Sequence, residues 1–283
     1  MRIGISPGNF MRFGEERYQV LKEAGFTCVD YGMADTETGF YLLQGEALEE
    51  AIAHERALAE AAGMQFSQVH GPWRWPAQDT TPENREERMG KMIRSIRMTA
   101  ALGCKYWVVH PVMPFGIEEA EQHELAAQTR EINLAFMRQL LDVARENDVV
   151  ICLENMPMPR FSLGSPQAIL DFVREIDDDH FQICLDTGHV AVFPSLRVGD
   201  EVRRLGKMIK VLHIHDNSGR GDEHLPPRRG IIAWEDFVLA LRQIGFDGVF
   251  SQEPAYSADA TCDEQKAFYA ELYALASQLL QQE

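Results

Sequence analysis

Four residues of metal-binding types each lie at the end of a mostly apolar run of sequence: Glu154, Asp186, His213 and Glu253. Burying a carboxylate there is costly unless it is paired, hydrogen-bonded or bound to a metal. Three carboxylates and one imidazole form an oxygen-rich donor set that suits Mn²⁺, Mg²⁺, Co²⁺ or Zn²⁺. Any one of them could instead cap a helix or pair with an arginine, so the metal hypothesis depends on all four together.

Other residues of these types lie at or just past the ends of predicted strands: His70, His110, His189, Asp222 and His224. They could ligate one or two more metal ions, or they could bind the hydroxyl groups of a polyhydroxylated substrate. His215 shares a strand face with His213, because side chains alternate along a strand. A neutral His215 that is bonded only to the backbone is equally consistent with the pattern.

Two features of the predicted rim loops could contact a substrate. Arg220 follows a strand end in the Gly-rich stretch Asn217–Arg220, within reach of an anionic or hydroxyl-bearing ligand, although it could also be a solvated surface charge. Trp73, Trp75 and Phe115 could form an apolar wall beside the site, or they could pack over helix ends.

Apolar runs and helical patterns alternate along the chain, which predicts the elements that position these residues. The predicted strands are Arg2–Ser6, Cys28–Tyr31, Phe66–His70, Tyr106–His110, Val149–Glu154, Phe181–Asp186, Lys210–Asp216 and Gly248–Glu253. The predicted helices are Glu15–Ala24, Ala47–Ala62, Pro82–Leu102, Glu118–Asn147, one that begins at Pro166, Val198–Met208, Trp234–Ile244 and Asp263–Gln281.

Such alternation is typical of parallel strands with helical crossovers, and a count of eight favours a closed barrel over an open sheet. No G-x-G-x-x-G fingerprint follows the first strand, as a dinucleotide fold would require. We therefore expect the α/β class, with residues 1–283 forming a single (β/α)8 TIM-barrel domain. All strands of such a barrel end on one rim, so the candidate residues should meet in an active site at the C-terminal rim.

Composition limits the partners and the compartment. The chain has 27 Lys and Arg against 44 Asp and Glu, a formal net charge of −17. Phosphate backbones and anionic lipids repel such a surface, so nucleic acid is disfavoured as a partner. Three of the five cysteines lie in apolar, strand-like runs, as expected of buried thiols in a reducing compartment. No run is long enough for a signal peptide or a membrane span, so we expect a soluble cytoplasmic protein.

Six short motifs, in this order and spacing, resemble the xylose-isomerase-like TIM-barrel superfamily. That group includes sugar-phosphate isomerases and epimerases and the AP endonuclease family 2, endonuclease IV. The resemblance covers nearly the whole chain. The motifs are Val-Val-His110-Pro, Leu-Glu154-Asn, Leu-Asp186-Thr-Gly-His189, His213-Ile-His-Asp216, Asp222-Glu-His224-Leu-Pro-Pro and Gln-Glu253-Pro.

The resemblance implies a divalent-metal-dependent isomerase or epimerase that acts on a sugar, a keto-sugar or a related polyol derivative. By that resemblance Glu154, Asp186, His213 and Glu253 hold the metal. Glu154 and Glu253 also exchange protons with the substrate carbon, while His189 and Arg220 contact its oxygens. The chemistry is coherent, because a proton beside a carbonyl is weakly acidic and a metal would stabilise the enediolate as it forms. Two carboxylates then allow one to remove the proton and the other to return it.

Three other functions stay open. A lyase or dehydratase acting on a keto-sugar or an inosose would also begin with enolisation. A multinuclear zinc DNA-repair enzyme similar to endonuclease IV needs nine ligands, and candidates for all nine occur here: His70, His110, Glu154, Asp186, His189, His213, Asp222, His224 and Glu253. The net charge argues against DNA. A sugar-binding barrel without catalysis, and assembly into a homo-oligomer, are also consistent with the sequence.

Overall fold

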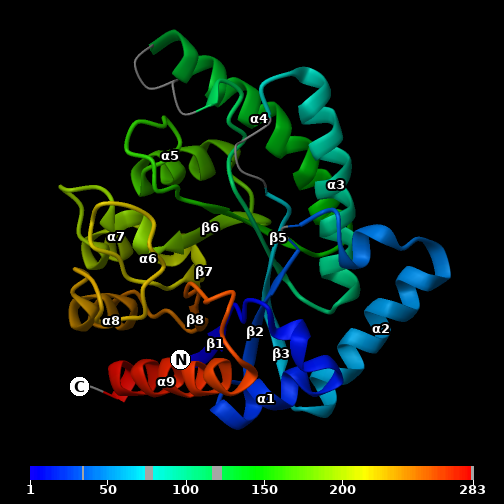
Figure 1. Cartoon of the computed structure of the whole chain (residues 1–283). Helices are drawn as coiled ribbons and strands as arrows, with labels where there is room; N and C mark the ends of the chain where they lie inside the picture. The colour runs from blue at the N-terminus through cyan, green and yellow to red at the C-terminus, as the bar shows by residue number, and fades with distance from the viewer. Residues whose placement is uncertain (34, 74–78, 117–122, 282–283) are drawn as a thin grey trace.

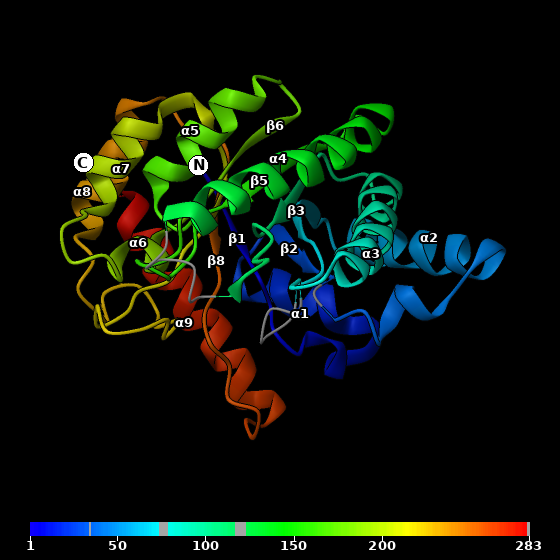
Figure 2. The same ribbon diagram turned by 90° about the horizontal axis from the view of Figure 1, so that it is seen from above.

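Eight parallel strands form a barrel that is surrounded by helices in a computed structural model, which describes residues 1–33, 35–73, 79–116 and 123–281. Figure 1 shows the strands inside the ring of helices, and Figure 2 gives a second view, from above. Strands β1 to β7 each pair with the next along the chain, β1 also pairs with β8, and an isolated parallel bridge between Ile214 and Gln252 links the end of β7 to β8. Between β7 and β8, Ile214 donates a backbone hydrogen bond to Ser251 at 2.9 Å. The predicted (β/α)8 TIM barrel is confirmed.

The strands are β1 (Arg2–Ile5), β2 (Cys28–Gly32), β3 (Gln65–His70), β4 (Tyr106–Val109), β5 (Val150–Glu154), β6 (Phe181–Asp186), β7 (Ile209–His213) and β8 (Val249–Gln252). The α-helices are α1 (Arg17–Ala24), α2 (Gly45–Ala61), α3 (Pro82–Ala101), α4 (His123–Glu146), α5 (Pro166–Ile176), α6 (Thr187–Ala191), α7 (Val198–Leu205), α8 (Trp234–Gln243) and α9 (Cys262–Gln281). Short 3-10 helices are η1 (Phe10–Glu16), η2 (Gly39–Leu42) and η4 (Gly206–Met208). None of the described helices combines the length and the apolar character needed to cross a bilayer.

Side chains of strands β4 to β7 alternate between two separate apolar clusters. On β7, Leu212 belongs to the large cluster between the strands and the helices, whereas Val211 belongs to the smaller cluster inside the barrel. The next inward position after Val211 is His213, and the same alternation turns Glu154 inward after Cys152 on β5. The strands therefore deliver polar side chains to the top of an apolar interior.

Local signals set the helix ends as the sequence predicts. Thr81 accepts a hydrogen bond from the backbone N–H of Asn84, and Pro82 takes the first helical position of α3. Ser165 and Pro166 begin α5 in the same way. These caps fix where the helices leave the rim loops.

The structure differs from the predicted elements in a few places. Strand β7 ends at His213, not at Asp216, because Asp216 turns to pair with Leu225 in an antiparallel bridge. The five-residue helix α6 directly follows Asp186 and carries His189, and the sequence pattern did not predict it. The start predicted for the helix over 118–147 falls within 117–122, which lies outside the described residues. The structure describes this helix from His123.

Candidate active site

The four residues proposed to hold a metal come from the tips of four neighbouring strands, β5 to β8. Strand register places Asp186 directly opposite His213. Glu154 ends β5, and Glu253 follows the last residue of β8. One ligand atom from each of the four lies within 4.8 Å of those of the other three. The barrel thus gathers side chains that are about a hundred positions apart in the sequence.

Glu154 and His213 form the buried centre of this group. His213 Nδ1 lies 2.8 Å from Glu154 Oε1 and 3.4 Å from Glu253 Oε2. The side chain of Glu154 is 1% exposed, whereas that of Glu253 is 21% exposed. Glu253 is therefore the more accessible of the two carboxylates.

His70 and His110 approach the second oxygen of Glu154. His110 Nε2 lies 3.0 Å from Glu154 Oε2, and His70 Nε2 lies 3.7 Å from the same atom. The three side chains form a second group whose ligand atoms all lie within 4.8 Å of one another. Glu154 thus belongs to both groups.

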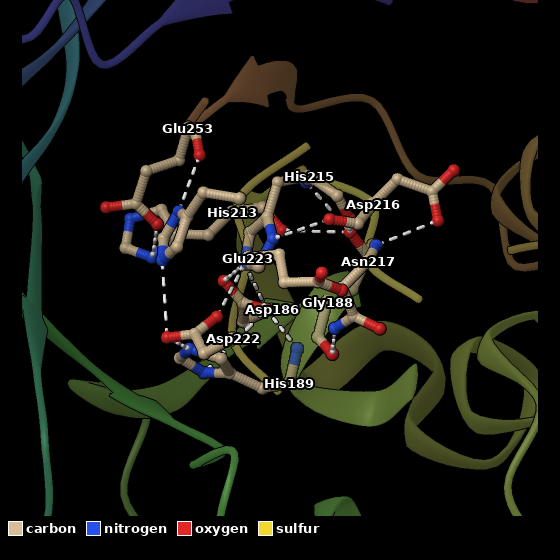
Figure 3. A network of polar contacts seen from close by, with 12 residues as sticks. Asp186, Gly188, His189, His213, His215, Asp216, Asn217, Asp222, Glu223 and Glu253 are labelled. Carbon is tan, nitrogen blue, oxygen red and sulfur yellow. Dashed lines mark hydrogen bonds and ion pairs between the residues drawn. The ribbon is translucent and has the colours of Figure 1, made fainter. Parts of the chain in front are cut away.

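A third group lies on the other side of Asp186 and contains His189, His215, Asp222 and His224. Figure 3 shows Asp186 and Asp222 meeting His189, with Glu253 beside His213. Asp222 Oδ2 lies 3.3 Å from Nε2 of both His189 and His224. His215 Nε2 lies 3.1 Å from Asp186, and the His215 ring stacks on His224. His215 therefore joins the site rather than bonding only to the backbone.

Backbone carbonyls fix which nitrogen of several imidazoles is free. A ring nitrogen that bonds a carbonyl must carry the proton, so the other nitrogen of a neutral ring keeps its lone pair. In His70, His189 and His224, Nδ1 donates to a carbonyl and Nε2 faces a carboxylate, which is the arrangement typical of metal-binding histidines. The pairs are His70 with Gly71 O at 2.8 Å, His189 with Asn155 O at 2.7 Å and His224 with Glu253 O at 2.8 Å.

The protonation of Glu154 and His70 also fits a cation. Burial opposes the charge on Glu154, but His213 and His110 hold its pKa well below the ordinary value. Burial and the neighbouring His110 lower the pKa of His70. An ionised carboxylate beside a neutral imidazole is the form that binds metal. Glu154 and His70 are therefore in the protonation states that bind a divalent cation.

His189 behaves differently in the metal-free protein. Burial alone would lower its pKa, but the carboxylates of Asp186 and Asp222 raise that pKa to about 10. Asp222 likewise raises the pKa of His224, against burial, to about 9. Both rings then carry a second proton and a positive charge near neutral pH, so a cation that binds this group must displace those protons.

The site opens into a cavity of about 340 Å³. The polar residues of its lining are His70, Asp79, Arg88, His110, Glu154, His189, Asp222, His224 and Glu253, and the apolar ones are Trp73, Pro111, Met113, Met156, Pro157 and Met158. Trp73 is 44% exposed, and its ring lies beside that of His110. This size and mixture suit a small polar molecule with an apolar side.

Of the rim residues predicted to contact a substrate, only some can be placed at the cavity. Trp73 lines the cavity, whereas Trp75 lies outside the described residues. Arg220 is exposed and does not line the cavity.

A larger groove of about 580 Å³ runs between α2 and α3, but Glu49 is the only carboxylate among its described lining residues, and no histidine is among them.

Two acidic residues near the site were not predicted from the sequence. Asp79 is buried, pairs with Arg88 and lines the cavity with it. Asp30, on β2, lies 2.9 Å from His213 Nε2 through its Oδ2 atom. A carboxylate inside the apolar run Cys28–Tyr31 was the available signal for Asp30. Asp79 sits in a polar loop and carries no such signal.

Residues 18–275 match the family model described as xylose isomerase-like TIM barrel, so the chain belongs to that family. The D-tagatose 3-epimerase-like protein, a solved structure, superposes with a TM-score of 0.78 at 23% identity, covering 99% of this chain and 98% of that one. At this identity the likeness shows the fold.

Curated relatives include two kinds of enzyme. The D-psicose 3-epimerase of Enterocloster bolteae is 29% identical over 150 residues, which is 53% of this chain and 45% of that protein. The probable endonuclease 4 of Mycoplasmopsis agalactiae is 26% identical over 172 residues, 56% of this chain and 58% of that protein. The chain thus matches about half the length of each of these relatives.

Proposed function

We propose that the protein is a divalent-metal-dependent epimerase or isomerase of a sugar, a keto-sugar or a related polyol derivative. The observation that carries this proposal is the convergence of Glu154, Asp186, His213 and Glu253 within 4.8 Å of one another, beside a small cavity that Glu154 and Glu253 line. Membership of the xylose isomerase-like family and the relative named D-psicose 3-epimerase support it.

The two glutamates are the proposed acid and base. Glu154 and Glu253 come from the outer two of the four neighbouring strands, so they approach a bound substrate from different sides. One carboxylate removes the proton from the carbon beside the carbonyl, and the other returns a proton to the opposite face. A divalent cation held by the four residues would supply the positive charge that stabilises the developing enediolate. If one glutamate moves the proton between adjacent carbons, the same site gives isomerisation.

Other residues would orient the substrate. The Nε2 atom of His189 faces the cavity beside Asp222, where it can contact a substrate hydroxyl. Trp73 offers an apolar face to the carbon chain. Arg220 would have to turn inward when substrate binds, since it lies exposed outside the cavity lining.

Solvent exchange tests the proposal. The Mn²⁺-loaded protein would be incubated in D₂O with a panel of ketoses and followed by NMR. We expect deuterium at the carbon beside the carbonyl together with the epimeric or isomeric ketose. A chelator-treated sample should give neither. Exchange followed by loss of water or of a leaving group would instead identify a lyase or dehydratase, for which an inosose and a 3-keto-glycoside belong in the panel.

A second candidate function is metal-dependent phosphoester hydrolysis, and the two further ligand groups favour it. His70 and His110 with Glu154, and His189, His215 and His224 with Asp222, could each hold another cation. Adjacent cations suit phosphoester cleavage, because they stabilise both the attacking and the leaving oxygen. The relative named probable endonuclease 4 points the same way. The net charge of −17 opposes DNA binding.

Metal stoichiometry and activity separate the two candidates. Elemental analysis of the purified protein should give about one cation per chain for the epimerase and two or three for the hydrolase. Cleavage of a duplex that carries an abasic site, without deuterium exchange in any ketose, would replace the first proposal with the second.

A further inference from the structure

Asp30 is a buried carboxylate inside the barrel. It lies in the middle of β2, and it is 1% exposed. Its neighbours along the strand, Val29 and Tyr31, pack outward into the core between the strands and the helices. A carboxylate in such a place is costly unless it has a partner that offsets the lost hydration.

That partner is His213, which comes from the far side of the barrel. Asp30 Oδ2 lies 2.9 Å from His213 Nε2. In the sheet order, β2 and β7 are separated by several strands, so this contact crosses the barrel interior. Neither sequence proximity nor strand pairing brings the two residues together.

Gln68 on β3 holds Asp30 in place. Its Nε2 donates to the same Asp30 oxygen at 3.0 Å and to the carbonyl of Leu212 at 3.2 Å. Leu212 immediately precedes His213, so one amide group connects the carboxylate to the backbone of the strand that carries the imidazole. Gln68 is itself fully buried. The Asp30 carboxylate therefore has a defined position relative to His213.

The two ring nitrogens of His213 consequently have different surroundings. Nε2 faces Asp30, whereas Nδ1 faces Glu154 at 2.8 Å and Glu253 at 3.4 Å. A proton on Nε2 would face the Asp30 carboxylate at ion-pair distance and would leave the Nδ1 lone pair for the four-residue group. A carboxylate that accepts the outer N–H of a histidine fixes the ring and makes the other nitrogen a stronger donor.

We propose that Asp30 is a positioning residue that holds His213 with Nδ1 directed at the metal and raises the affinity of the site for the cation. This inference rests on the proposed metal-dependent function. The Asp30 side chain contacts His213 and Gln68, and it is not among the described residues that line the cavity. Its effect on the metal therefore passes through His213.

Mn²⁺ affinity tests this role directly and does not require a known substrate. Free Mn²⁺ would be measured by electron paramagnetic resonance during titration of the metal-free protein. Removing a carboxylate that supports a metal-bound histidine typically weakens metal binding about 10- to 100-fold. We expect a loss of that size for Asp30→Ala. Asp30→Asn should lose less, because its amide oxygen can still accept the His213 proton although the charge is gone.

Glu55→Gln is the matched control for removing a buried carboxylate. Glu55 lies on α2, is 4% exposed and bonds Arg17 and Tyr18 on α1. Its replacement should lower the melting temperature and leave the Mn²⁺ affinity unchanged. A purely structural Asp30 would behave in the same way. Asp30→Asn preserves the side-chain shape, which keeps the test valid if Asp30→Ala does not fold.

The possible outcomes are distinct. Folded Asp30 variants that bind Mn²⁺ as tightly as the wild type would overturn the inference and leave the proposed function intact. If the wild-type protein takes up no Mn²⁺, the metal-dependent function fails, and the inference about Asp30 fails with it. A loss of affinity in the Asp30 variants alone supports both.

Discussion

Glu154 and Glu253 have the same functional group in unlike surroundings. Glu154 is buried and contacts His70, His110 and His213, whereas Glu253 is partly exposed and faces the cavity. Contacts of this kind hold a carboxylate ionised and in position. Glu253 therefore has more freedom to act on a substrate carbon, while Glu154 also organises the group.

Glu253→Gln should abolish the interconversion of the two epimers of a reactive ketose. Loss of a general base typically costs about 10²- to 10⁴-fold in rate, and the amide cannot take up the proton. The rate would be measured by NMR in D₂O at saturating Mn²⁺. Glu223→Gln is the control, since Glu223 is an exposed neighbour of Asp222 that bonds Ser218. Full epimerisation activity in Glu253→Gln would rule out the two-carboxylate mechanism.

Gly188 is required because His215 lies against it. A Cβ at this position would stand 1.9 Å from His215 Cε1, closer than any real contact. We expect Gly188→Ala to displace the ring from Asp186 and to destabilise the protein by about 1–3 kcal/mol, as overpacking does. Urea unfolding measures the change.

Gly90→Ala provides the contrast for that measurement. Gly90 lies within α3, and a Cβ added there would meet no atom of a neighbouring element within 4 Å. Alanine at this position should stabilise the helix by about 0.5–1 kcal/mol. Equal effects at the two glycines would contradict the proposed role of the close approach at His215.

The link between β7 and α8 depends on one aspartate. Asp216 accepts hydrogen bonds from the backbone of Asn217 at 3.0 Å, the backbone of Ile232 at 3.2 Å and the indole of Trp234 at 2.8 Å. These bonds anchor both ends of the loop that carries Asp222 and His224. Asp216 therefore helps to position Asp222 and His224, two candidate ligands in the loop whose ends it holds.

Asp216→Ala should destabilise the protein by at least about 2 kcal/mol, because it leaves buried donors without an acceptor. Equilibrium unfolding in urea would measure this. Asp179→Ala, at an exposed position, should change stability by no more than about 0.5 kcal/mol. If Asp216→Ala is equally mild, another contact anchors the loop.

The elements were largely predictable because each strand and helix has a local signal. Alternating apolar runs marked the eight strands, and Thr81 with Pro82 marked the start of α3. Helix α6 was not predicted because its five residues are too few for an apolar pattern of helical spacing to repeat. Asp30 stood out in the sequence only as a carboxylate within an apolar run, and its partner could not be predicted, because the contact with His213 crosses the barrel. The arrangement of strand tips in a barrel is what made the four-residue group predictable.

The charged groups around His213 make metal binding depend on pH. Burial alone would lower the pKa of His213, but Cys184, the carboxylates Glu154 and Glu253, and the bond to Asp30 together raise it well above the ordinary value. In the metal-free protein His213 therefore keeps an extra proton near neutral pH. A cation must displace that proton before it can bind Nδ1.

Mn²⁺ affinity should consequently rise with pH between about 6 and 8, by up to about tenfold per pH unit if one proton is released. Titrations at several pH values, with the released protons counted in a weakly buffered solution, would measure this. An affinity that is independent of pH would contradict the raised pKa of His213.

The convergence of Glu154, Asp186, His213 and Glu253 on one cation can be tested most directly by crystallography. A crystal of the Mn²⁺-loaded protein would be measured at a wavelength where manganese scatters anomalously. We predict a strong anomalous peak bounded by these four side chains, with His213 bound through Nδ1. A fully loaded protein whose peak lies elsewhere, or whose four side chains bind no cation, would contradict the proposed site and the enzyme built on it.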